Sequence, residues 1–217
     1  MKRWRDGGFR KIKGRMRTDE QAMWRVQMHH DVGAFAELVR RWEEPLRRLG
    51  MRMLGDTHGA EDVAQEAFAR VFSHRRDFDP AARFSTWLWR IAVNLCRDEL
   101  RRRGRKAEVP LPTQGPGDAE TEGLVLEGPG EPTPAEAAEA VERADAVRQV
   151  LMRLPEPYRV VVALRHYEGL KFQEIAAVLD IPEGTVKSRM AEALDRMETM
   201  LRPWADGLGV VRGKTQR

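Results

Sequence analysis

Apolar residues recur at steps of three and four through most of the chain, a spacing that predicts helices rather than strands. In the first half, one such stripe begins at Phe35 and is ended by Gly55 and Asp56. A second helix is predicted over residues 60–72, and a third over residues 84–103. The positions expected on the buried faces are Phe35, Leu38, Val39, Trp42, Leu46, Leu49 and Met53; Val63, Ala67, Phe68, Val71 and Phe72; and Leu88, Ile91, Ala92 and Leu95.

The second half repeats this pattern in shorter pieces. Helices are predicted over 134–154 and 158–167, and Gly169 ends the latter. Residues 172–197 have the layout of a helix-turn-helix with a turn at 180–184. Asp180 occupies a position often held by glycine, and Asp tolerates left-handed backbone better than most residues. The expected buried positions are Ala137, Val141, Ala144, Val147, Leu151 and Leu154; Ile175, Ala176 and Leu179; and Val186, Met190, Leu194 and Met197.

Composition divides the 217 residues into segments. Residues 107–136 hold seven acids, no Lys or Arg, and repeated Pro and Gly, so they predict a flexible, extended linker. Residues 1–17 hold eight Lys or Arg against one acid and predict a disordered basic arm. We therefore expect an all-α protein with two small helical domains, 18–104 and 136–202, each with its own core. A flexible acidic Pro/Gly-rich linker, 105–135, joins them; the second contains the helix-turn-helix, and a tail follows from 203 to 217.

The predicted helix over 84–103 concentrates the candidate chemistry. Ser85 is expected to cap it. An amide and three cations follow one face at helical steps, and three aromatic residues open the helix. Cations suit phosphates and aromatic faces suit unstacked bases, so this helix and the loop at 77–85 indicate single-stranded nucleic acid. The alternative is an amphipathic helix with a solvated basic side. The residues concerned are Arg90, Asn94, Arg97 and Arg101, with Phe84, Trp87 and Trp89.

Several classes of function are disfavoured by what the sequence lacks. The net charge of +4 favours an anionic partner only mildly. A single cysteine, Cys96, excludes an intramolecular disulfide and a cysteine-rich zinc site. No set of His, Cys or carboxylates has catalytic or ligand spacing, so we expect no enzyme, no metal and no cofactor. No apolar run approaches the roughly 20 residues of a membrane span, and no signal peptide is evident. These features predict a soluble, cytoplasmic protein without membrane insertion.

Two stretches of this chain resemble a known family. DVAQEAF at 62–68, followed after a loop by FSTWLWRIAVNLCRDELRR, resembles domain two of bacterial sigma factors of the extracytoplasmic-function (ECF) group of the sigma-70 family. LPEPYRVVVALRHYEGLKFQEIAAVLDIPEGTVKSR resembles sigma domain four. The resemblance covers roughly Thr18 to Leu201.

That resemblance implies a protein that binds core RNA polymerase, directs it to promoters by reading minus-thirty-five and minus-ten elements, promotes strand opening, and is regulated by an anti-sigma factor. Promoter DNA would be bound both as duplex and as melted single strand. Phe68 is either a polymerase contact or part of the core. The implied contacts are Asp62, Gln65, Glu66 and Phe68 for the polymerase; Phe84, Ser85, Trp87, Asn94, Arg97 and Arg101 for the minus-ten strand; and Lys187, Ser188, Arg189 and Glu192 for the minus-thirty-five duplex.

One alternative from another class stays open at this point. The string TVKSR also resembles the recognition helix of response-regulator output domains, which favours a conventional helix-turn-helix DNA-binding transcriptional regulator. A protein that binds only duplex DNA has no need of the tryptophan-rich basic helix at 84–103. The acidic linker likewise has two interpretations, a mimic of nucleic acid within the polymerase or a plain spacer.

Overall fold

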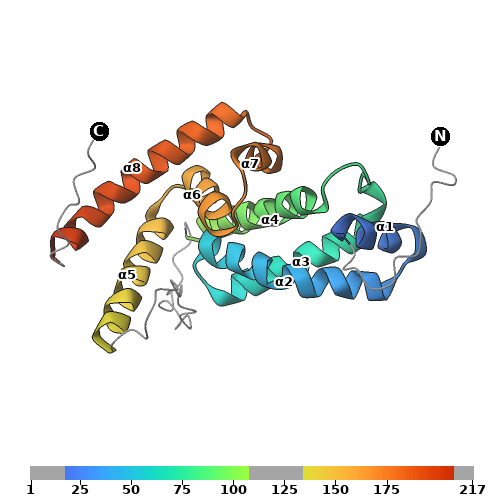
Figure 1. Ribbon diagram of the computed structural model, residues 1–217, viewed down its shortest axis with the longest axis horizontal. Helices are drawn as coiled ribbons and strands as arrows, with labels where there is room; N and C mark the ends of the chain where they lie inside the picture. The colour runs from blue at the N-terminus through green and yellow to red at the C-terminus, as the bar shows by residue number, and fades with distance from the viewer. Residues whose placement is uncertain (1–17, 108–133, 208–217) are drawn as a thin grey trace.

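The computed structural model describes residues 18–107 and 134–207, and every regular element within these ranges is helical (Figure 1). The all-α prediction is therefore confirmed for the described part of the chain. The predicted arm at 1–17 and most of the predicted linker and tail lie outside it. The first unit comprises α1 (Asp19–His29), α2 (Val32–Leu54), α3 (Thr57–Ser73), the short 3-10 turn η1 (Arg75–Asp77) and α4 (Phe84–Ala107). The second comprises α5 (Pro134–Arg153), α6 (Glu156–Val162), the π-helical turn η2 (Ala163–Tyr167), α7 (Phe172–Leu179) and α8 (Glu183–Gly207).

Local side-chain contacts set the ends of the first helices. Asp31 caps α2 by accepting the Ala34 N–H at 2.9 Å, and Gly55 ends that helix with φ of 80°. The spacing of apolar residues did not predict α1. The start of α1 is nevertheless set by a local sequence motif, a capping box. The Thr18 side chain accepts the Gln21 N–H, and the Gln21 side chain accepts the Thr18 N–H. A Thr followed three residues later by a Gln is the sequence signal that could have predicted the start of α1.

Helices α2 and α3 cross closely, and a glycine makes that approach feasible. A Cβ atom at Gly50 would lie 2.7 Å from the Cα of Ala60, so any larger residue would push the two backbones apart. Helices α1 and α4 also pack on α2, and α4 packs on α3. The result is a four-helix unit in which α4 packs against α1, α2 and α3.

Of the predicted buried positions whose side chains the structure describes, most are buried, the others are partly buried, and three are exposed. Phe72 is 38% exposed and lies at the end of α3, where its ring contacts Phe35 of α2 and the guanidinium of Arg75. In α8, Leu194 is 52% exposed while its neighbour Ala193 is fully buried. Val141 in α5 is exposed as well. Helical spacing identified the apolar stripe in each case, but the neighbouring helices cover only part of it.

The second unit follows its predicted turns. Gly169 has φ of 69° and ends the segment formed by α6 and η2. Asp180 has φ of 55° and ψ of 49°, which is the left-handed conformation that the helix-turn-helix needs there. Helix α8 continues through Pro203 to Gly207. The first five residues of the predicted tail, 203–207, are therefore part of this helix.

The two units pack directly against each other (Figure 1). Helix α2 contacts α5, α6 and η2, and α4 contacts α7. One apolar cluster includes Leu88 and Ala92 of α4 together with Ile175 and Leu179 of α7. A smaller cluster between α5, α6 and α8 belongs to the second unit alone. The second unit thus has a small core of its own and shares the rest with the first, a contact that the sequence did not predict.

Candidate nucleic-acid interface

The three arginines and one asparagine predicted to share a face of α4 follow one another at steps of four, three and four residues. Arg90, Asn94 and Arg101 are exposed, and Arg97 is partly buried. Arg90 and Arg101 are separated by 11 residues, which corresponds to about 16 Å along a helix. The four side chains form what we call the basic face of α4: Arg90, Asn94, Arg97 and Arg101.

The aromatic residues at the start of α4 belong mainly to the core. Phe84 is fully buried, and Trp89 is buried with its ring centroid 5.6 Å from that of Trp42. Trp87 is only partly buried, and its ring lies 5.3 Å from that of Phe78. In this arrangement Trp87 is the aromatic residue at the start of α4 that keeps a surface for stacking, while Phe84 and Trp89 anchor the helix.

The prediction that Ser85 caps α4 was wrong. The helix begins one residue earlier, and the N–H of Phe84 donates to Oε1 of Glu20 in α1 at 3.2 Å. A carboxylate near a helix N-terminus is also favoured by the helix dipole. The cap is therefore supplied by a side chain 64 residues away in the sequence, and Ser85 is left free to face the neighbouring cavity.

The loop that precedes α4 is held in place by hydrogen bonds from α1. The side-chain amide of Gln27 in α1 donates to the carbonyls of Arg76 and Phe78, at 3.1 and 3.0 Å. The Phe78 ring packs against those of Phe84 and Trp87. The loop at 77–85 thus has a defined shape beside the start of α4, which is what a base-accepting pocket requires.

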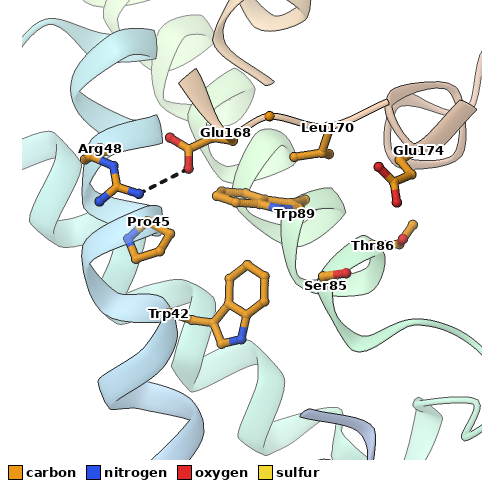
Figure 2. Close-up of a pocket in the computed structure, with 10 residues that line it drawn as sticks. Trp42, Pro45, Arg48, Ser85, Thr86, Trp89, Glu168, Leu170 and Glu174 are labelled. Atoms are coloured by element: carbon orange, nitrogen blue, oxygen red, sulfur yellow. Dashed lines mark hydrogen bonds and ion pairs between the residues drawn. The ribbon is translucent and has the colours of Figure 1, made fainter. Parts of the chain in front are cut away.

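A cavity of about 360 Å³ opens between the two units, next to the start of α4 (Figure 2). Of the predicted loop 77–85, only Ser85 lines it. Its walls combine two indole rings, two hydroxyl groups and charges of both signs. They come from α2, α4, the segment that joins η2 to α7, and α7 itself. The lining residues are Trp42, Pro45, Arg48, Ser85, Thr86, Trp89, Glu168, Gly169, Leu170 and Glu174.

Glu168 is the most enclosed carboxylate of this cavity. Its side chain is 4% exposed and lies 3.4 Å from Arg48 and 3.5 Å from Arg52 (Figure 2). Burial raises the pKa of Glu168 above its ordinary value, and the two arginines offset only part of that rise. The guanidinium of Arg52 also lies 4.0 Å from the centre of the Tyr167 ring. The second unit therefore places a buried negative charge against two arginines of the first.

The residues predicted to bind polymerase divide into an exposed group and a core residue. Asp62, Gln65 and Glu66 are exposed on α3. Phe68 is 8% exposed, and its ring packs against Phe35, which favours a role in the core. Asp62 and Glu66 also line a groove of about 370 Å³ between α3 and α4, with Asp98, Glu99, Arg102 and Arg105 on its other wall.

The predicted recognition residues lie at the start of α8, on the outer side of the helix-turn-helix. Lys187, Ser188 and Glu192 are exposed, and Arg189 is partly buried. Lys187 pairs with Glu183 at 2.7 Å, and Glu192 pairs with Arg196 at 2.8 Å. Within the described residues Arg189 makes no ion pair, so its guanidinium has donors available for another partner.

Two expected absences can be reported only for the described residues. There, no group of three His, Cys, Asp or Glu side chains has a geometry suited to a metal ion. Within the same residues, no helix is long and apolar enough to cross a bilayer.

The structure also brings together residues that the sequence did not single out. Arg83 pairs with Glu174 at 2.6 Å, and Arg97 pairs with Glu156 at 2.8 Å. The partners are 91 and 59 residues apart. No local spacing predicts such pairs, because each depends on how the second unit lies against the first.

Two family models match the chain in order. Residues 38–106 match the model described as sigma-70 region 2, and residues 144–197 match sigma-70 region 4. The chain is similar to the ECF RNA polymerase sigma factor SigW of Bacillus subtilis strain 168, with 37% identity over 79% of this chain and 91% of that protein.

Solved structures show the same fold. The chain resembles CnrH, solved in complex with the cytosolic domain of CnrY, with a TM-score of 0.60 and 23% identity over 85% of this chain and 97% of that one. It also resembles the sigma factor RpoE of Bartonella quintana, solved with the anti-sigma factor NepR, with a TM-score of 0.57 and 19% identity over 77% and 96% of the two chains.

Proposed function

The chain belongs to the extracytoplasmic-function group of sigma-70 RNA polymerase sigma factors, and we propose that it opens promoters through the basic face of α4 and reads duplex DNA through the start of α8. Sigma factors bind core RNA polymerase and promoter DNA and direct promoter-specific transcription. They are not an enzyme family, since the polymerase makes the bonds. The proposal concerns which residues of this chain make the contacts.

The observation that carries the proposal is the basic face of α4 beside a partly exposed indole. Three arginines at helical steps can follow a phosphate backbone, and the Asn94 amide among them can bond a base edge. Trp87 offers a ring face to an unstacked base at the N-terminal end of the same helix. Cations alone would bind duplex and single strand alike. The stacking surface favours the melted strand, and that preference is what opens the minus-ten element.

The shape of the loop before α4 supports a pocket for an extruded base. Because Gln27 and Phe78 hold the loop in place, its backbone groups are positioned before DNA arrives. A preformed pocket loses less conformational entropy on binding than a loop that must order first. Unstacking one base costs a few kcal/mol, which contacts in such a pocket would offset.

The start of α8 supports the reading of duplex DNA at the minus-thirty-five element. In helix-turn-helix proteins the N-terminal residues of the second helix contact base edges in the major groove. Arg189 has an unpaired guanidinium suited to the O6 and N7 atoms of guanine, and Glu192 can accept from the cytosine amino group. Lys187 and Ser188 are suited to phosphates at the edges of the groove.

Polymerase docking is assigned to the exposed polar residues of α3. Asp62, Gln65 and Glu66 project from consecutive turns, and Asp62 and Glu66 face a groove shared with α4. Carboxylates at such a site would pair with cations on the polymerase. Regulation by an anti-sigma factor is part of the same proposal, supported by the complex of RpoE with NepR.

Run-off transcription is the direct test. Purified bacterial core polymerase is mixed with a pool of genomic fragments from the source organism, with and without this protein. Discrete new transcripts that depend on the protein are expected, and their start sites would reveal both promoter elements. The absence of transcripts, together with retained duplex binding and no binding to core polymerase, would instead identify a conventional regulator.

A further inference from the structure

Helix α1 holds the loop that precedes α4 at both of its ends. At the first end, the side-chain amide of Gln27 donates to the carbonyls of Arg76 and Phe78, at 3.1 and 3.0 Å. At the second end, a carboxylate oxygen of Glu20 accepts the N–H of Phe84 at 3.2 Å. Three hydrogen bonds from two side chains of one helix therefore fix the backbone where the loop begins and where it ends.

The spacing of these two side chains sets the distance between the ends of the loop. Glu20 and Gln27 are seven residues apart, so they lie two turns apart on one face of α1, at about 10 Å along the helix axis. Because both side chains belong to the same helix, the separation of the two loop ends is determined by α1 and not by the loop itself.

Helix α1 is in turn fixed to the rest of the first unit. Its inner face has three fully buried residues, Ala22, Met23 and Val26. In its first turn, Asp19 accepts hydrogen bonds from Nη1 of Arg41 at 2.7 Å and from Nε1 of Trp42 at 3.0 Å, both on α2. The core and α2 therefore determine where Glu20 and Gln27 lie before DNA arrives.

The part of the loop between its two ends is exposed and closed by its own turn. Asp79 accepts the N–H of Ala82 at its carbonyl and the N–H of Ala81 at its side chain, each at 2.9 Å. Every residue after Phe78 and before Phe84 is exposed. The rings of these two phenylalanines are buried, with centroids 6.1 Å apart. The loop thus presents one backbone shape to solvent at the start of α4.

We propose that Glu20 and Gln27 are positioning residues for promoter opening: by fixing both ends of the loop, they determine which extruded base the loop accepts. The inference rests on the proposed role of α4 and its preceding loop in binding the melted strand. Neither side chain needs to contact DNA. Hydrogen bonds to a base edge weaken steeply when their distance or angle departs from the ideal. A loop that loses its fixed ends therefore loses discrimination between bases.

The size of the effect follows from the number of hydrogen bonds removed. When only a fraction of loops has the accepting shape, the apparent affinity for the extruded base is reduced by that fraction. Loss of both Gln27 hydrogen bonds should reduce the preference for the accepted base by about 5- to 30-fold. Loss of the single Glu20 hydrogen bond should reduce it by about 3- to 10-fold.

Two pairs of variants separate the hydrogen bonds from charge and side-chain length. Glu20→Met removes the acceptor, whereas Glu20→Gln removes the same charge but keeps an oxygen that can accept the Phe84 N–H. Gln27→Met keeps the length of the side chain but removes its donors. Gln149→Met makes the same exchange at an exposed position of α5. Losses are expected in Glu20→Met and Gln27→Met, with most of the parent behaviour retained in Glu20→Gln and Gln149→Met.

The main readout is base preference in the holoenzyme. Each variant is combined with purified bacterial core polymerase and with fork-junction DNA whose duplex and protruding non-template strand are both randomised, and the bound molecules are sequenced. The parent chain should enrich one base at the strand position that the loop accepts. Glu20→Met and Gln27→Met should weaken that enrichment and leave enrichment within the minus-thirty-five duplex unchanged. A destabilised sigma factor would instead lose both preferences together.

Amide hydrogen exchange of the free protein gives a second readout that needs no DNA. In Glu20→Met, the Phe84 N–H loses its acceptor and should exchange about 3- to 10-fold faster. In Gln27→Met, the exposed N–H groups of Ala81 and Ala82 should exchange faster as the loop loses its first anchor. The amides of Leu88 and Ala92, buried within α4, should keep the exchange rates of the parent chain.

The outcomes separate this inference from the proposed function. If the parent holoenzyme enriches no base in the protruding strand, the proposed strand-binding function is wrong and the inference falls with it. If the parent enriches a base and Glu20→Met and Gln27→Met enrich it equally, the function stands and the positioning role is disproved. Equal losses at strand and duplex, or faster exchange throughout α4, also disprove the positioning role, because the two side chains would then only stabilise the fold. So would faster exchange in the loop without any change in base preference.

Discussion

The guanidinium of Arg159 in α6 donates a hydrogen bond to the carbonyl oxygen of Met53 at the end of α2, with a nitrogen–oxygen distance of 2.5 Å. Its other terminal nitrogen donates to the carbonyls of Met152 and Leu154, at 2.7 and 2.9 Å. The side chain is buried, and burial lowers the pKa of Arg159. One charged group therefore satisfies carbonyls at the ends of α2 and α5 and ties the two units together.

Replacing this arginine should destabilise the whole chain. Arg159→Met keeps much of the volume but leaves three carbonyls without their donor, so we expect the free energy of unfolding to fall by about 3 kcal/mol. Urea unfolding followed by far-UV circular dichroism measures the change. Arg153→Met, at an exposed position on α5, is the matched control and should stay within about 0.5 kcal/mol of the parent chain. Equal losses of unfolding free energy in both variants would show that the hydrogen bonds of Arg159 to the three carbonyls do not contribute to stability.

Glu168 should make stability depend on pH in an unusual direction. Because burial raises its pKa in the folded state, the folded chain binds more protons than the unfolded chain between the ordinary glutamate pKa and the raised one. Its contribution to stability is present below that window and is lost as pH rises through it. The difference in unfolding free energy between Glu168→Gln and the parent chain should therefore shift in favour of the variant as pH rises from about 4 to 7. A difference that is constant with pH would contradict the assignment.

Trp87 and Asn94 should matter more for opening a promoter than for finding it. The double variant Trp87→Ala and Asn94→Ala removes one stacking ring and one base-edge contact, and each stacked base is worth about 1–3 kcal/mol. We expect a loss of permanganate reactivity at thymines of the minus-ten element while closed complexes persist. Trp204→Ala combined with Gln149→Ala removes the same groups from exposed positions of the second unit and should leave opening intact. Unchanged thymine reactivity in the first variant would exclude these residues from melting.

Arg189 should read duplex DNA without contributing to polymerase binding. Loss of a two-pronged contact to guanine costs about 1–3 kcal/mol, so Arg189→Ala should weaken promoter-specific binding by about 5- to 150-fold. Gel-shift titration of the holoenzyme measures this, and pull-down of core polymerase should be unchanged. Arg202→Ala, near the far end of α8 and paired with Glu198, is the control. Parallel loss of DNA and polymerase binding by Arg189→Ala would indicate unfolding of the second unit instead.

The acidic surface of α3 should govern affinity for the polymerase. Combining Asp62→Asn with Glu66→Gln removes two exposed carboxylates while keeping their shapes, and we expect about a 10-fold loss of affinity for core polymerase that shrinks at high salt. The neighbouring Glu61 is also exposed, and Glu61→Gln serves as the control. Biolayer interferometry at two salt concentrations measures both. A similar loss in the control would mean that only the net charge of α3 matters.

Single residues show where sequence reasoning succeeded and where it stopped. The left-handed turn at Asp180 was expected from its residue type, and the start of α8 follows from the turn that it creates. By contrast, Phe84 and Trp89 looked like stacking surfaces and are buried, while Leu194 looked buried and is exposed. Helical spacing identifies which residues share a face. It does not say which neighbouring helix covers that face, because that depends on residues distant in the sequence.

The sequence by itself determined most of the helices and the caps of α1 and α2, because these depend on residues within about four positions of one another. The order of the two sigma regions follows from the order of their motifs along the chain. The tertiary structure alone decided that Glu20 caps α4, that Arg159 donates to the carbonyl of Met53, and that Glu156 pairs with Arg97. Each of these contacts joins residues at least 59 positions apart. Their formation requires the packed arrangement of all the helices, since the free energy that selects one partner among many comes from the shared core and not from the pair.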